Sequence, residues 1–135
     1  TPTAVPKCDA KQTDVILVLD ACCFTDASFA DNFVKLLDFA GNYTEQFDLG
    51  PDDVQFGAVV FGNSPLRVFD LKDFSNHTKM TQAIGEAPAL RGTLRTNKAF
   101  DLVASDMFSV AKGGRENASK IVILMTDSPS ADLAD

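Results

Sequence analysis

The chain has 135 residues, which is the size of about one compact domain. Its 12 basic and 19 acidic side chains give a net charge of −7, which repels polyanions and argues against nucleic acid as a partner. Apolar residues make up 45% and charged residues 23%, a globular rather than a disordered composition. No apolar run approaches the ~20 residues that span a bilayer, and the first residues do not resemble a signal peptide. The composition therefore predicts one acidic domain that does not insert into a membrane.

Residues 1–13 show little periodicity and are predicted to be a leader or linker, so the predicted domain covers residues 14–135. Four segments of that domain are predicted to be strands: 14–20, 54–61, 66–71 and 121–125. The first, second and fourth are almost continuously apolar, which is typical of strands buried on both faces. The third alternates in polarity, as a half-exposed edge strand does.

Three segments have apolar residues at spacings of three and four, which predicts helices. The first covers residues 28–41 with Gly41 as its stop, the second follows Ser75 as a cap, and the third runs from Asn97 as a cap to Ala111. Because these helices alternate with the strands, the sequence predicts a doubly wound α/β fold. Its sheet is mostly parallel with one antiparallel edge strand, and helices cover both faces.

Two predicted strands end in an aspartate: Asp20 after the first and Asp127 after the last. Open parallel sheets bind ligands beyond the carboxyl ends of their strands, where the strand order reverses. The two carboxylates therefore mark the expected site. The alternative interpretation is that they only cap the turns that follow.

The adjacent cysteines Cys22 and Cys23 favour several hypotheses: a vicinal disulfide, a zinc ligand pair or a catalytic thiol. Zinc needs further ligands and a thiol nucleophile needs a base, but His77 is the chain's one histidine. His77 begins a predicted helix that should lie away from the carboxyl ends of the strands. The alternative is that the two small thiols fill a crowded turn. No glycine-rich phosphate loop follows any predicted strand.

Three asparagines begin an N-glycosylation sequon: Asn42, Asn76 and Asn117. All three fall in predicted loops or at predicted helix starts, where a glycan can be accommodated. This pattern predicts a secreted glycoprotein.

Five segments, in this order, resemble a von Willebrand factor type A domain of the extracellular-matrix type, similar to those of matrilins and of collagens VI and XII. They are residues 14–20, 47–52, 54–61, 71–75 and 121–127. The resemblance implies a doubly wound fold that serves adhesion or protein–protein binding. It also implies a divalent cation at the strand ends, held by an Asp-x-Ser-x-Ser loop, a threonine and an aspartate.

The chain departs from that ligand pattern. Asp20 and Asp127 match the two aspartates, but Cys22 and Phe24 replace the serines and Leu94 replaces the threonine. Sulfur is a poor ligand for Mg²⁺, and apolar side chains cannot bind it at all. The resemblance therefore implies a degenerate, empty metal site and no cofactor, with Mg²⁺ or Mn²⁺ at the strand ends as the alternative.

Thr93, Thr96 or Ser128 could supply a substitute oxygen ligand if the loops shifted. Without an ion, Asp20 and Asp127 would lie close together, which predicts that one is hydrogen-bonded or has a raised pKa.

Domains of this family often join a cysteine before the first strand to one after the last helix. Cys8 matches the first position, but no cysteine follows Cys23, so Cys8 is expected to pair with a cysteine outside this segment. The family would also continue beyond the strand at 121–125 with further helices and strands. The chain is therefore expected to lack these C-terminal elements, which would leave that strand uncovered on one side.

Taken together, the sequence predicts a secreted, non-enzymatic module for adhesion or assembly in an extracellular matrix. Its acidic surface favours collagen-like or basic matrix proteins as partners. Arg91 and Arg95 are candidate partner contacts, unless they are only solvated loop charges. The alternatives are a metal-dependent adhesion receptor module and a thiol or zinc protein that uses Cys22 and Cys23.

Overall fold

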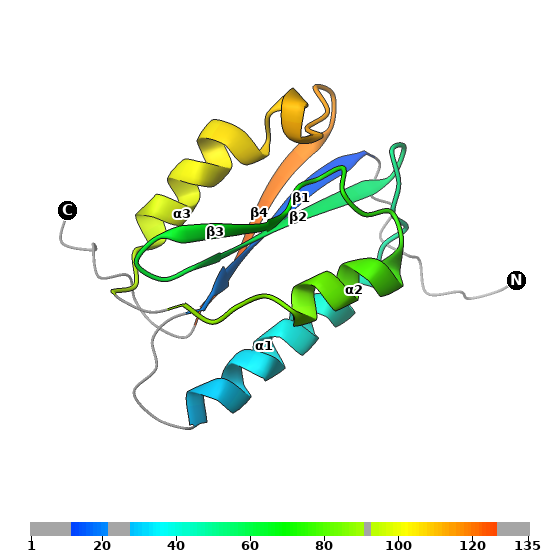
Figure 1. Cartoon of the computed structure of the whole chain (residues 1–135). Helices are drawn as coiled ribbons and strands as arrows, with labels where there is room; N and C mark the ends of the chain where they lie inside the picture. The colour runs from blue at the N-terminus through cyan, green and yellow to red at the C-terminus, as the bar shows by residue number, and fades with distance from the viewer. Residues whose placement is uncertain (1–11, 22–27, 91–92, 127–135) are drawn as a thin grey trace, which may run out of the picture.

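The computed structural model describes residues 12–21, 28–90 and 93–126, which form one sheet with helices on both sides (Figure 1). The strands are β1 (Thr13–Asp20), β2 (Val54–Phe61), β3 (Pro65–Phe69) and β4 (Ser119–Met125), in the order β3-β2-β1-β4. The helices are α1 (Ser28–Thr44), α2 (His77–Gly85), α3 (Thr96–Leu102), the π-helical η1 (Val103–Met107) and the 3₁₀ turn η2 (Val110–Lys112). β2 and β4 run parallel to β1 and β3 runs antiparallel to β2, so the predicted α/β fold is confirmed. None of the described helices is long and apolar enough to span a bilayer.

β1 lies between β2 and β4, and all eight of its residues are buried. Its neighbours align at the same point, because Thr13 pairs with Val54 of β2 and with Ser119 of β4. Side chains alternate across a strand, so β1 contributes to two separate cores. A continuous apolar run suits this position, since water reaches neither face.

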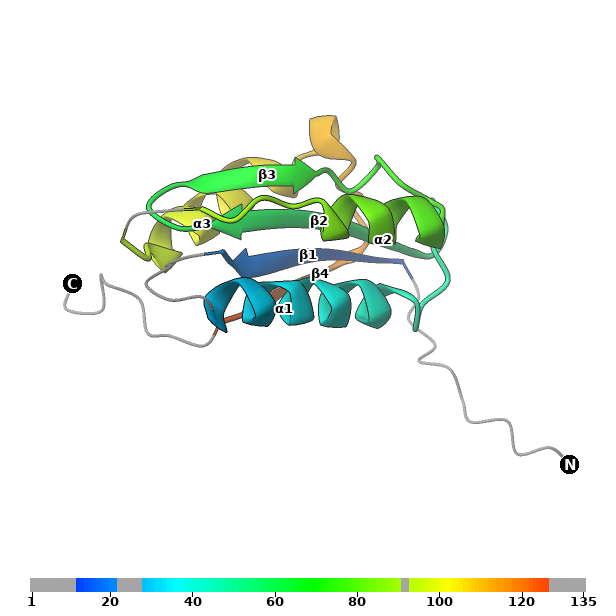
Figure 2. The ribbon, with the colours of Figure 1, turned by 60° about the horizontal axis from the view of Figure 1, so that its bottom comes forward.

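One core lies between the sheet and the pair α1 and α2, and the other lies between the sheet and α3 with η1 (Figure 2). The first contains Phe33 and Leu37 of α1 together with Met80 and Ile84 of α2. The second contains Ala99, Val103 and Met107. The apolar stripes of the helices therefore cover opposite faces of one sheet, as predicted.

Gly41 does not end α1, which continues to Thr44. A Cβ at Gly41 would lie 3.0 Å from Cγ2 of Thr81 on α2, closer than side chains normally pack. The glycine therefore serves the close approach of α1 and α2. The prediction of a stop was wrong because a sequence does not distinguish a packing glycine from a terminating one.

Three other predicted boundaries also shift. Asn76, rather than Ser75, caps α2, since its Oδ1 accepts a hydrogen bond of 3.0 Å from the backbone N–H of Lys79. β3 ends at Phe69, before a turn in which the N–H of Asp70 donates to Asp73. Asn97 lies inside the first turn of α3 rather than capping it.

The helix predicted to run from Asn97 to Ala111 is divided into three parts. It is α-helical to Leu102, widens into the π-helical η1, and is followed by the short turn η2. η1 buries Val103 and Met107, while its Asp106 pairs with Arg67 on β3. Side-chain periodicity alone could not reveal this widening, because apolar residues three and four apart fit either helix type.

A buried ion pair stabilises the end of the sheet at which the parallel strands begin. The side chain of Asp14 is fully buried, and it accepts hydrogen bonds of 2.9 Å from both Nε and the backbone N–H of Arg115. Lys120 also pairs with this carboxylate. Arg115 further donates to the carbonyls of Pro51 and Thr13, so one guanidinium joins the β1 start to the loop before β2.

Replacing Arg115 by methionine should lower the free energy of unfolding by about 3 kcal/mol, because it removes the main partner of a buried carboxylate. Urea unfolding monitored by circular dichroism measures this. The matched control is Arg67→Met, which breaks the more exposed pair with Asp106 and should cost no more than about 1 kcal/mol. Equal losses for the two variants would contradict the structural role of Arg115.

β4 is an edge strand within the described residues, and it is not buried on both faces as its apolar sequence predicts. Ile121 is 45% exposed, Val122 39% and Leu124 38%. Among the described elements β4 pairs only with β1, and the expected lack of the family's further C-terminal elements stays a prediction. An apolar edge with unpaired backbone groups is a site for pairing with another chain.

We therefore expect the 135-residue chain to self-associate as its concentration rises, and the double variant Ile121→Lys with Val122→Lys to do so less. Lysines on an edge strand oppose strand pairing by charge. Sedimentation velocity over a concentration series measures the effect. Val34→Lys is the control, because Val34 is equally apolar and 55% exposed but lies on α1. Identical behaviour of all three proteins would contradict the prediction.

Candidate functional site

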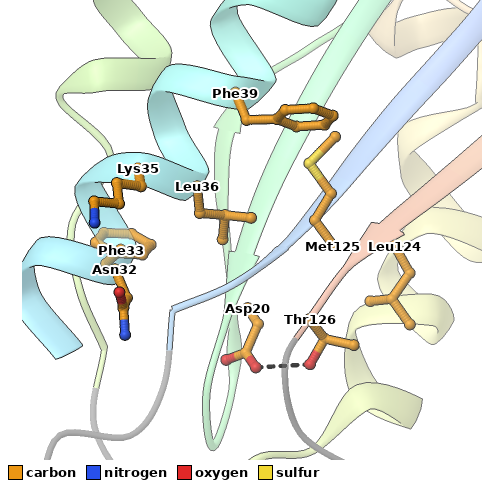
Figure 3. Close-up of a pocket in the computed structure, with 9 residues that line it drawn as sticks. All are labelled: Asp20, Asn32, Phe33, Lys35, Leu36, Phe39, Leu124, Met125 and Thr126. Carbon is orange, nitrogen blue, oxygen red and sulfur yellow. Dashed lines mark hydrogen bonds between the residues drawn. The ribbon is translucent and has the colours of Figure 1, made fainter. Parts of the chain in front are cut away.

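Asp20 and Thr126 lie beside each other at the carboxyl ends of β1 and β4 (Figure 3). The hydroxyl of Thr126 donates a hydrogen bond of 2.7 Å to Oδ2 of Asp20, and Asp20 is only 4% exposed. This point is where the strand order reverses, because β2 and β4 lie on opposite sides of β1 in the sheet. The structure thus places Asp20 where open α/β sheets bind ligands. The prediction did not include Thr126, a small polar residue directly before Asp127.

The loop before α3 is attached to the same pole of the domain, which is the end at which the parallel strands β1, β2 and β4 finish. The N–H of Leu90 donates to the carbonyl of Ala21 at 2.8 Å, and the N–H of Arg95 donates to that of Gly62 at 2.9 Å. Leu94, between these anchors, is 8% exposed and packs into the core beneath α3. Thr93 beside it is exposed, and Arg95 and Thr96 are half-buried.

A groove of about 560 Å³ runs between α1 and β4 next to Asp20. Phe39 of α1 and Met125 of β4 point toward each other across it, and Leu36 projects from α1 toward the strands beside them (Figure 3). Asn32 and Lys35 supply polar atoms on the α1 side. The sequence prediction missed this groove, although an aromatic residue at 39, next to the apolar stripe of α1, was a signal that the stripe is unusually wide.

Several predicted site residues lie outside the described residues: Cys8, Cys22, Phe24, Arg91, Asp127 and Ser128. The proximity of Asp127 to Asp20, with the raised pKa that it would cause, therefore stays a prediction. Asp20 itself is hydrogen-bonded, through Thr126.

The described residues do not fit the family's cation ligand set. Asp20 supplies a carboxylate and Thr126 a hydroxyl, but the side chain at the expected threonine position, Leu94, is apolar and faces the core. Within residues 12–21, 28–90 and 93–126, no cluster of three or more His, Cys, Asp or Glu side chains could hold a metal ion. The described part of this site is an apolar groove with Asp20 and Thr126 at its polar end.

His77 lies at the opposite pole from this groove. Its Nε2 is 2.7 Å from the carbonyl oxygen of Phe47, in the connection that leads into the start of β2. The full length of β1 separates this pole from Ala21, the last described residue before Cys22. His77 is thus placed away from the strand ends, as predicted, which argues against a thiol or zinc site that uses it.

The three sequon asparagines are all exposed. Asn42 lies in the last turn of α1, Asn76 caps α2, and Asn117 lies in the turn before β4. None of them is near the groove, because each of these segments lies at the amino-end pole of the parallel strands (Figure 1).

The chain is similar to segments of much longer proteins. It is 32% identical over 128 residues to von Willebrand factor A domain-containing protein 2 of Xenopus laevis, 95% of this chain and 16% of that protein. It is 30% identical over 126 residues to the human collagen alpha-6(VI) chain, 93% of this chain and 5% of that one. Bovine integrin alpha-2 is 31% identical over 124 residues, 88% of this chain and 10% of the integrin.

Among solved structures, proximal thread matrix protein 1 from the mussel byssus, with a zinc-occupied MIDAS motif, superposes with a TM-score of 0.83 at 28% identity. The match covers 92% of this chain and 33% of that one. The family model for the von Willebrand factor type A domain matches residues 14–135. The four-stranded mixed sheet, the flanking helices and Asp20 at the strand switch point agree with this match. The chain belongs to the von Willebrand factor type A domain family.

Proposed function

We propose that this chain is a non-enzymatic protein-binding module of a secreted matrix protein, with a degenerate metal-ion-dependent adhesion site. The proposal rests on the burial of Leu94, an apolar side chain at a position where a cation ligand is expected. Cys22 and Phe24 at the two serine positions point the same way. The similarity to a collagen VI chain and to a mussel thread matrix protein supports a matrix location.

The proposed partners are extracellular matrix proteins that are collagen-like or basic. The net charge of −7 favours a basic partner, and opposite charges speed association more than they tighten binding. The groove between α1 and β4 adds an apolar surface next to Asp20, at the carboxyl ends of the parallel strands. Arg91 and Arg95, on either side of Leu94, are the proposed local contacts for acidic groups of the partner.

A metal-dependent adhesion module is the second candidate. The zinc-occupied MIDAS motif of the mussel protein favours it, since that protein shares this fold at a TM-score of 0.83. Asp20 and Asp127 would supply the carboxylates, with Thr93, Thr96 or Ser128 as substitute oxygen ligands. Mg²⁺ or Mn²⁺ is the cation expected for such oxygen donors.

Thermal unfolding with Mg²⁺ or Mn²⁺ against EDTA separates the two candidates. We expect no change in the melting temperature, because the ligand set is incomplete. A cation at 100 times its dissociation constant would instead add ~2.7 kcal/mol of stability and raise the melting temperature by roughly 8 °C at this chain length. A rise of that size would establish the second candidate. The triple variant Cys22→Ser, Phe24→Ser and Leu94→Thr restores the family's ligand types and should acquire cation-dependent melting.

Binding to immobilised fibrillar collagen tests the first candidate directly. We expect binding to be the same in Mg²⁺ and in EDTA, and to weaken with added NaCl, because salt screens the attraction between an acidic surface and a basic partner. Surface plasmon resonance measures both effects, with serum albumin as the acidic control protein. Binding that EDTA abolishes would overturn the metal-independent assignment, and no binding in either buffer would exclude this collagen as the partner.

A further inference from the structure

Three exposed asparagines of N-glycosylation sequons lie in segments far apart in the chain. Asn42 is in the last turn of α1, Asn76 is the cap of α2, and Asn117 is in the turn that leads into β4. The sequence alone places them 34 and 41 residues apart, with no indication that they share a surface.

The topology brings all three to the amino-end pole of the parallel strands. α1 descends from the carboxyl end of β1 to the start of β2, so its last turn lies at this pole. Asn117 precedes Ser119, which pairs with Thr13 at the first position of β1. Next to Asn76, the ring of His77 is 2.7 Å from the carbonyl of Phe47, which lies in the segment after α1 (Figure 1).

The asparagines that would be modified are exposed at this pole. Glycosylation joins the asparagine Nδ2 to the anomeric carbon of an oligosaccharide carried on a lipid diphosphate. The new N–C bond replaces the C–O bond to the diphosphate, Nδ2 loses one proton, and the lipid diphosphate leaves. At Asn76 the helix cap uses Oδ1 rather than Nδ2, so the cap and a glycan are compatible.

The Asn42 sequon adds a constraint on timing. Its Thr44 is fully buried, and the hydroxyl donates a hydrogen bond of 2.7 Å to the carbonyl of Gly41. A transferase must reach this hydroxyl together with the asparagine. Modification at Asn42 therefore has to precede the packing of the end of α1.

We propose that N-linked glycans at Asn42, Asn76 and Asn117 form one coat over the amino-end pole and keep protein partners off it. The inference rests on the proposed secretion, because the lipid-linked donor is met only in the secretory pathway. It gives the domain two unlike poles: a glycan-covered one around Arg115 and His77, and one around Asp20 and Thr126 without a sequon among the described residues.

Secretion of the 135-residue chain from mammalian cells, behind a heterologous signal peptide, tests the occupancy. Intact mass spectrometry before and after peptide N-glycosidase should show three glycans. Asn42→Gln, Thr78→Ala and Ser119→Ala should each lose one, and Thr78→Ala does so while keeping the Asn76 cap. Fewer than three glycans on the chain without substitutions would overturn the coat of three glycans. This count is independent of matrix binding, so it can fail while the proposed function stands, and the reverse.

Trypsin serves as a protein-sized probe of the coat. Lys112 lies at the amino-end pole, where the Lys72 amine donates to the neighbouring carbonyl of Ala111 at 2.8 Å, whereas Lys98 lies in the first turn of α3 at the other pole. Removing the glycans should speed cleavage after Lys112 and leave cleavage after Lys98 unchanged. Equal cleavage after Lys112 with and without glycans would overturn the exclusion of partners.

A glycan introduced at the opposite pole provides the converse test. Pro65→Thr creates a sequon at Asn63, which is exposed in the turn between β2 and β3, next to the anchor between Gly62 and Arg95. Its glycan should slow cleavage after Arg95 and not after Lys112. Pro65→Ala changes the same residue without creating a sequon, and should leave both cleavage rates as they are.

Discussion

The burial of β1 on both faces and along both edges is the constraint on which the rest of the structure depends. Its five apolar residues, 15–19, contribute alternately to two cores, so a shift of one residue would exchange these side chains between them. Each large apolar side chain that is buried contributes about 1.5–3 kcal/mol, which fixes the register strongly. Because β2 and β4 take their register from β1, this strand also determines which residues meet at each pole of the sheet.

The two ends of β1 carry the same residue type in different surroundings. Asp14 is fully buried against the guanidinium of Arg115 and the amine of Lys120, which compensate the cost of removing a carboxylate from water. Asp20 is nearly as buried but accepts a hydrogen bond from the Thr126 hydroxyl. The amino end is thus held by full charges, from Arg115 in the turn before β4 and from Lys120 in β4. The carboxyl end has a neutral donor beside its carboxylate and an apolar groove next to it.

The loop before α3 shows how this pole holds together by apolar packing. Burial of Leu94 and the hydrogen bond from the Arg95 N–H to the Gly62 carbonyl attach the loop to the sheet. The position of this loop therefore depends on the core beneath α3.

The sequence by itself determined the fold class, the order of strands and helices and the position of Asp20 at a strand end, because continuous apolar runs and helical spacing are local signals. It could not separate the packing role of Gly41 from a helix stop, detect the π-helical turn η1, or show that Thr126 reaches Asp20. Those features depend on contacts between segments that are distant in the chain, such as Gly41 with Thr81. For the same reason only the tertiary structure brought the three sequons to one pole and opened a groove between α1 and β4: both follow from how the helices cross the sheet, which no local pattern encodes.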